Sequence, residues 1–117
     1  MQFEAFDRMA LALPGAVFDI KWGSERTYCV GAKMFALAGH LGDEHPRYMF
    51  KASELGFEML VESGAAIPAP YLARSKWVQL TAFDALSDDE LTSYVNQAHA
   101  LIAAKLSRTL RSELGIG

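Results

Sequence analysis

The spacing of hydrophobic residues changes period along this chain, and each change marks a boundary between predicted elements. Apolar residues recur at helical spacing from Phe3 to Leu13, and the Pro14-Gly15 pair then ends the pattern, so we predict a first helix here. From Val17 the period becomes two, with Phe18, Ile20 and Trp22 on one side and polar residues mostly on the other. This alternation predicts a half-buried strand.

Three more strands are expected in the first half of the chain. Gly23-Ser24 predicts a turn into a second strand at residues 27–30, and Gly31-Ala32 predicts a type II′ hairpin, because glycine tolerates the positive φ required first in that turn. Residues 33–39, KMFALAG, are apolar on both sides, which is typical of a central strand. A polar loop at 39–46 leads into a fourth strand at 47–51.

The second half begins with a short helix. Ser53 can cap its start and Gly64 can end it, and we expect Leu55, Met59 and Leu60 to form its buried side. A loop containing Pro68 and Pro70 then leads into a fifth strand with the sequence WVQLT.

The last predicted element is one long amphipathic helix. Its start is marked by SDDE at 87–90, a capping box in which Ser87 and Glu90 satisfy each other's backbone N–H groups. An apolar stripe continues to Leu106, and we expect Arg108 and Arg111 to lie at the negative end of the helix dipole.

This order of elements predicts the fold class α+β. We expect a single domain over residues 1–117, with an antiparallel sheet of about five strands and the N-terminal and C-terminal helices packed on one face. The other face of the sheet is left open. Its expected occupants are Lys33, Arg47, Lys51, Trp77 and Gln79.

Composition and charge exclude several classes of protein. Hydrophobic residues make up 51% and charged residues 21% of the 117 residues, as in ordinary globular domains. No apolar run approaches the ~20 residues of a membrane span, and the first segment is acidic where a secretory signal is basic, so we expect a soluble cytoplasmic protein. The single cysteine, Cys29, excludes an internal disulfide and a multi-cysteine zinc site. The net charge of −3 argues against nonspecific adhesion to nucleic acid by the whole surface.

Four segments in order resemble the MmcQ/YjbR family of small bacterial proteins, covering the chain from about Phe3 to Leu106. They are ALPGAVFDIKWG, GAKMFALAG, PAPYLARSKWVQL and SDDELTSYVNQAHALIAAKL. The resemblance implies a frataxin-like (CyaY-like) fold and a double-wing mode of DNA binding in which strand hairpins act as wings. Carried over by position, it points to Lys33, Lys51, Tyr71 and Trp77. Lys76 stands at the position before the tryptophan where many proteins of the family have a histidine, so no role for an imidazole carries over.

The leading functional hypothesis is therefore a DNA-binding accessory protein. Backbone contacts are expected from Lys33, Arg47, Lys51, Arg74 and Lys76. Tyr71 and Trp77 can stack on bases, each for about 1–3 kcal/mol. The alternative for Trp77 is burial beneath the proline-containing loop at 64–70, and lysines at strand edges also serve to prevent aggregation.

The rival hypothesis is a protein-interaction or small-ligand module that uses the same aromatic and basic sheet face without nucleic acid. It is favoured if Trp77 is buried, or if Glu54, Glu58 and Glu62 interrupt the basic face.

No catalytic or cofactor motif is present in the sequence. A nucleophile elbow, a phosphate-binding glycine loop and a helical His–Glu pair are all missing, so we expect no enzyme and no cofactor. Cys29 lies among apolar strand residues, so we expect it to be an unreactive packed side chain. We expect His99 to lie on the surface of the last helix. The candidate metal ligands of one loop match no rigid motif, and we expect no metal there; they are His40, Asp43, Glu44 and His45. An iron role is disfavoured because the first helix carries few acidic residues.

Overall fold

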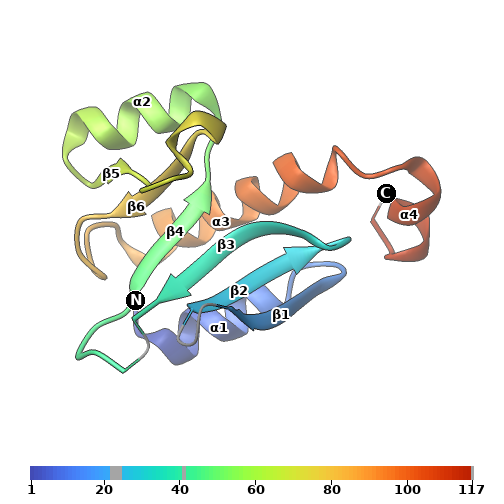
Figure 1. The fold of residues 1–117 in the computed structure, drawn as a ribbon, viewed down its shortest axis with the longest axis horizontal. Helices are drawn as coiled ribbons and strands as arrows, with labels where there is room; N and C mark the ends of the chain where they lie inside the picture. The colour runs from blue at the N-terminus through green and yellow to red at the C-terminus, as the bar shows by residue number, and fades with distance from the viewer. Residues whose placement is uncertain (22–24, 41, 117) are drawn as a thin grey trace.

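The computed structural model describes residues 1–21, 25–40 and 42–116. Three parts of the predictions lie outside the described residues. They are the turn at Gly23-Ser24, the placement of Trp22 on the side of Phe18 and Ile20, and Leu41 of the predicted loop. The elements, drawn in Figure 1, are α1 (Phe3–Leu11), β1 (Ala16–Lys21), β2 (Glu25–Val30), β3 (Lys33–Gly39), β4 (Arg47–Lys51), α2 (Glu54–Ser63), β5 (Ala66–Pro68), the 3₁₀ turn η1 (Ala73–Ser75), β6 (Trp77–Leu80), α3 (Asp88–Ala103) and α4 (Arg108–Glu113).

The strands form one antiparallel sheet in the order β1-β2-β3-β4-β6-β5, which confirms the α+β class. The sheet has six strands where about five were expected, because residues 66–68 of the predicted loop pair with β6. This added strand is at the sheet edge, the position where a proline such as Pro68 is tolerated, since its missing N–H need not serve a second neighbour. β3 lies inside the sheet and is buried from Phe35 to Gly39, as its apolar sequence predicted.

The main hydrophobic core lies between one face of the sheet and the helices α1 and α3, which cover the same side in Figure 1. Phe6 of α1 stacks on Tyr48 of β4 with ring centroids 4.1 Å apart, and Phe50 packs near Tyr94 of α3. Tyr48 and Phe50 are completely buried, so the alternation in β4 correctly predicted its inner side. We call this side of the sheet the helix face.

The opposite side of the sheet, called here the open face, is partly covered by the segment 69–76 that precedes β6. Leu37, Ala69 and Trp77 form a second buried cluster on it, and Met34, Met49 and Leu72 pack around them. The covering segment is tied to the strand by backbone hydrogen bonds, from the Ala69 N–H to the Trp77 carbonyl at 3.0 Å and from the Trp77 N–H to the Leu72 carbonyl at 3.3 Å. The open face therefore has a small apolar layer of its own.

The hairpin between β2 and β3 differs from the expected turn. Both Gly31 and Ala32 have positive φ, 56° and 66°, which is the pattern of a type I′ turn, so the type II′ prediction was wrong. A side chain at Gly31 would collide with Leu106, which explains why glycine precedes the alanine.

Two helix predictions require correction. In α2 the caps at Ser53 and Gly64 are confirmed, but Leu55 and Met59 are exposed, and the helix instead turns Leu60 inward. The predicted long helix is two helices, because α3 ends at Ala103 and the Ser107 side chain accepts from the Leu110 N–H to start α4. Arg108 and Arg111 consequently belong to α4 and not to the end of α3.

His99 was predicted on the helix surface, and this was wrong as well. It is buried at 6% exposure, with Nε2 2.8 Å from the Pro14 carbonyl oxygen, and its ring meets Phe35 edge-on. The partner comes from a segment 85 residues away, so no neighbour in the sequence could have indicated it.

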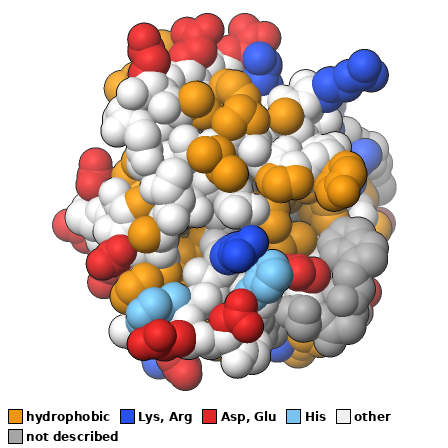
Figure 2. All heavy atoms as spheres, turned by 60° about the vertical axis from the view of Figure 1, so that its left-hand side comes forward, with side chains coloured by type: hydrophobic (Ala, Val, Ile, Leu, Met, Phe, Trp, Pro, Cys, Tyr) orange, Lys and Arg blue, Asp and Glu red, His pale blue; other side chains and the backbone are white. Residues whose placement is uncertain are grey.

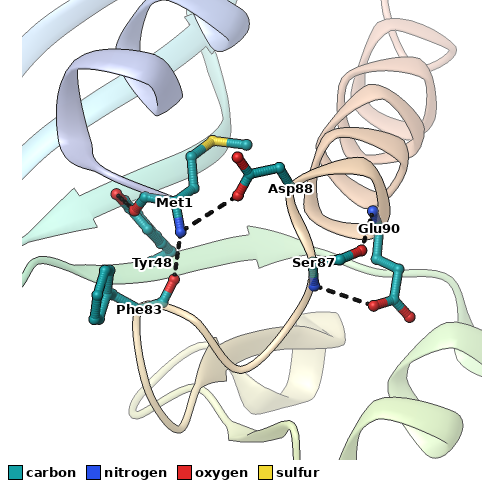
Figure 3. A network of polar contacts seen from close by, with 6 residues as sticks. All are labelled: Met1, Tyr48, Phe83, Ser87, Asp88 and Glu90. Atoms are coloured by element: carbon teal, nitrogen blue, oxygen red, sulfur yellow. Dashed lines mark hydrogen bonds and ion pairs between the residues drawn. The ribbon is translucent and has the colours of Figure 1, made fainter.

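The start of α3 carries the predicted capping box. The Glu90 N–H donates to Ser87 Oγ and the Ser87 N–H donates to the Glu90 carboxylate, each at 3.1 Å (Figure 3). Beside it, the Met1 amino group donates to the Phe83 carbonyl at 3.0 Å and lies 3.6 Å from the Asp88 carboxylate. These contacts join the first residue, the loop before α3 and the helix terminus.

Candidate functional site on the open face

The five cations expected to form one basic face are divided between different parts of the molecule. Lys33 pairs across the hairpin with Val30, a helix-face residue, so it does not lie on the open face as predicted. Arg47 and Lys51 do lie on the open face, because Lys51 pairs with Trp77 of β6 and Arg47 alternates with the helix-face residue Tyr48 in β4. Four residues along a strand span about 13 Å, so these two charges stand at opposite ends of β4. No continuous basic stripe connects them, because Met49 lies between.

A smaller basic group forms where β4 ends, and we call Lys51, Lys76 and Lys105 the lysine cluster. The pKa of Lys51 is lowered first by its partial burial and then by the positive charges of Lys105 and Lys76, while the nearby Glu54 carboxylate acts in the opposite direction. The Lys51 ammonium donates to the Ser75 carbonyl oxygen. Lys105 was missed as a site residue because it lies in the turn after α3, far from the others in sequence. Arg74 is exposed in the adjoining η1 turn.

Lys76 has a structural as well as an electrostatic role. It ends η1 in the left-handed conformation with φ of 61°, and its ammonium lies 4.9 Å from the centroid of the Phe57 ring. A cation over an aromatic ring is attracted by the ring's quadrupole, which fixes this side chain against α2.

The two aromatic residues predicted to stack on bases have opposite environments. Trp77 is only 4% exposed and lies under residues 69–72, so it packs beneath the loop, and its ring is closed to a nucleic-acid base. Tyr71 is fully exposed and has a φ of 67°. Of the two, only Tyr71 has a ring that an incoming molecule can contact.

Next to the buried cluster, the open face is hollowed into a pocket of about 600 Å³. Met34, Leu37 and Met49 from the sheet and Pro70, Tyr71 and Leu72 from the covering segment supply its apolar surface. Its polar groups come from Glu25, His40, Arg47 and Gln79. Figure 2 shows hydrophobic side chains gathered across the middle of one face, with basic, histidine and acidic side chains beneath them.

Glu25 provides the least satisfied polar atom of this pocket. Its Oε2 is buried and has no hydrogen-bond partner among the described residues. The carboxylate lies against Gly39 of the neighbouring strand, where an added Cβ would overlap it. Glycine at position 39 therefore leaves the space that the carboxylate occupies.

The histidines of the loop after β3 are engaged locally. His40 Nδ1 lies 3.4 Å from the Asp43 carboxylate, while the His45 ring stacks on Phe83 with centroids 3.9 Å apart. Within the described ranges no group of three His, Cys, Asp or Glu side chains is arranged to hold a metal ion. None of the described helices has the length and apolar character to cross a membrane.

Several pocket residues were missed at the sequence level. Glu25, Met34, Leu37, Met49 and Leu72 carry no motif, but the apolar character of β3 on both sides was a usable signal. A strand buried on both faces requires a cover on each, and here the second cover is the segment that walls the pocket.

Comparison with known proteins adds a family to this description. The model of the YjbR family matches residues 11–101, a range that includes all six strands and most of α3. No curated protein matches the chain.

Proposed function

The chain belongs to the YjbR family, and we propose that it is a non-enzymatic ligand-binding module whose site is the pocket on the open face. The observation that carries the proposal is the pocket's combination of size and lining. Sites for small molecules typically enclose about 300–1,000 Å³, with mostly apolar walls and a few polar groups that fix orientation. The pocket, at about 600 Å³, has apolar residues from two β-strands and the covering segment, with four polar residues among them.

The burial of Trp77 also supports this function over base stacking. A tryptophan that fills the space between sheet and loop holds the pocket wall in place, because residues 70–72 continue directly from the backbone bonded to β6. The separation of Arg47 from Lys51 leaves the middle of the open face apolar, which suits a small organic ligand better than a phosphate backbone.

The test is a titration of the ¹⁵N-labelled protein with a panel of neutral aromatic and aliphatic fragments, monitored by amide chemical shifts. We expect hits to shift the amides of Leu37, Met49 and Leu72. A Met49→Gln variant should weaken those hits, since it places an amide in the apolar floor.

Met59→Gln is the matched control, because Met59 is exposed on α2 and outside the pocket. Fragments that shift only residues elsewhere, or that bind Met49→Gln and Met59→Gln equally, would contradict the proposal.

A second function, contact with nucleic-acid backbones, is favoured by one observation. The lysine cluster brings three positive charges together, and two of them lower the pKa of Lys51, an effect that Glu54 offsets only in part. An anion placed there would relieve this repulsion, and phosphates are neutralised by lysine and arginine in this way. The nucleic-acid contacts of the double-wing hypothesis would then be limited to one end of the sheet, at the lysine cluster and the adjoining Arg74.

Fluorescence anisotropy of labelled duplex and single-stranded DNA tests this second function at low and near-physiological salt. Binding should weaken steeply with salt and be lost in Lys51/Lys76/Lys105→Gln, whereas Arg47→Gln should bind normally because it lies outside the cluster. Equal loss in both variants, or no binding at low salt, would refute a site at the lysine cluster.

A further inference from the structure

The chemistry of the pocket's polar groups indicates what class of ligand it takes. Arg47 is exposed, so its charge remains hydrated, whereas Oε2 of Glu25 is shielded from solvent and unpaired among the described residues. Leaving a charged acceptor buried without a donor is costly, and a donor that meets it gains more than a donor meeting a hydrated group. Among the polar groups of the pocket, the Glu25 carboxylate is therefore the one that gains most when a ligand brings a hydrogen-bond donor.

The position of the carboxylate allows such a donor to approach. Glu25 is partly exposed as a residue and lines the pocket, while its oxygen rests on Gly39. The terminal torsion of a glutamate is soft, so the group can turn from the glycine backbone toward a ligand. Among the side chains that the structure describes, those of residues 1–20, 25–40 and 42–116, no lysine, arginine or histidine nitrogen lies within ion-pair distance of it.

The apolar part of the pocket favours a ring. Met34 and Met49 place two thioethers in the floor, and sulfur makes favourable contacts with aromatic rings. The exposed ring of Tyr71 stands at the wall, where it can stack on or meet the edge of an aromatic ligand.

We propose that the pocket binds a small aromatic ligand that carries a protonated amine, with the ring on Met34, Leu37 and Met49 and the ammonium on Glu25. This inference rests on the proposed ligand-binding function and adds the ligand's charge and shape. The arrangement selects against an aromatic carboxylate of the same size, because two carboxylates would face each other in a partly desolvated site.

Three probes with the same ring test the preference for a cationic ligand separately from ligand binding by the pocket. Tryptamine carries an ammonium, indole-3-propionate carries a carboxylate and indole carries neither. Titrated into the full chain at pH 7 and followed by amide shifts of pocket residues, tryptamine should bind about tenfold more tightly than indole-3-propionate, as expected for one charge-assisted hydrogen bond.

Glu25→Gln should remove this preference, because the neutral amide no longer attracts the ammonium. Glu58→Gln is the matched control on the exposed side of α2 and should keep it. Arg47→Gln should keep the preference or increase it, because the variant loses a positive charge of the pocket that attracts the carboxylate probe and repels the ammonium.

The outcomes are distinct. If indole and both charged probes shift pocket residues with equal affinity, or if Glu25→Gln retains the preference, the cationic-ligand inference is overturned while the pocket stands. If indole-3-propionate binds more tightly and this preference disappears in Arg47→Gln, the ligand is an anion held by Arg47, and the cationic-ligand inference is overturned. If none of the three probes shifts a pocket residue, the ligand-binding function itself is contradicted.

Discussion

Tyr28 shows how one residue can make stability depend on pH. It is completely buried in β2, and its hydroxyl donates to Asp7 Oδ1 at 2.7 Å, while Arg26 Nε pairs with the same carboxylate at 2.5 Å. Burial raises the pKa of Tyr28 above its usual range, and the hydrogen bond to Asp7 raises it further. The folded state therefore retains a proton that the unfolded chain gives up near pH 10.

We predict that Tyr28→Phe is less stable than the parent protein at pH 9, and that this difference in the free energy of unfolding becomes smaller as the pH rises to 11. A raised folded pKa contributes stability that is fully present below the unfolded pKa and is lost above it, at up to about 1.4 kcal/mol per pH unit. Phenylalanine loses the hydrogen bond to Asp7, about 1.5–3 kcal/mol for a charged acceptor, but has no proton to lose. Urea unfolding at several pH values measures both effects, and a difference that stays constant with pH would contradict this reasoning.

Gly39 is the second residue whose substitution has a specific expected result. Its φ is not positive, so alanine fits the backbone, but the new Cβ would occupy the place of the Glu25 carboxylate. We predict that Gly39→Ala changes the free energy of unfolding by less than about 1 kcal/mol, because a flexible side-chain end can move away. Tryptamine binding should be retained, as measured by the same amide titration, because the carboxylate that meets the ammonium has already turned away from Gly39. A loss of binding several-fold or more would show that the carboxylate must rest on Gly39 to hold the ligand.

At this scale the sequence predicted residues whose role depends on near neighbours. The caps at Ser53 and Ser87 and the alternation of Tyr48 and Phe50 were readable because their partners lie within a few positions. The role of Glu25 depends on Gly39 across a strand pair. A single sequence contains no direct signal for such a partner.

Among the elements, α3 offers the clearest test of a local signal. Ser87 and Glu90 satisfy backbone donors at its start, and the adjoining Asp88 also lies near the Met1 amino group. We predict that Ser87→Ala lowers the free energy of unfolding by about 1 kcal/mol, the usual cost of removing such a cap. Thermal or urea unfolding measures the loss.

Ser93→Ala serves as the control, since Ser93 is exposed in the middle of the same helix, where alanine is the better helix former. It should leave stability unchanged or raise it slightly. An equal loss in the two variants would mean that the capping box adds nothing to α3.

Two differences from the predicted elements, the break after α3 and the added strand β5, have one physical origin. Residues 104–106 continue the apolar stripe of α3, yet the chain turns there so that Leu106 can pack against Gly31 of the β2–β3 hairpin. Residues 66–68 become a strand because β6 offers them an edge to pair with. In both places contacts from distant segments decide the local structure, and hydrophobic spacing alone does not include those contacts.

For the whole molecule, the sheet separates two hydrophobic layers of unequal size. The larger layer, against α1 and α3, is the core that the strand and helix patterns predicted. The smaller layer around Trp77 supports the covering segment and with it one wall of the pocket. The α+β class followed from the order of elements, whereas the pocket did not, because it depends on how a loop lies across three strands.

This division leads to a prediction for Trp77→Ala. Removing a buried tryptophan typically costs about 3–5 kcal/mol, and here the loss falls on the smaller layer. Residues 69–76 should lose hydrogen-exchange protection and the pocket should lose its affinity for tryptamine, because the loop no longer has a side chain to pack on. Amides of α3 and β3 should remain the most protected in the variant, since the main core is intact. Uniform loss of protection across both layers would instead mean that Trp77 supports the entire fold.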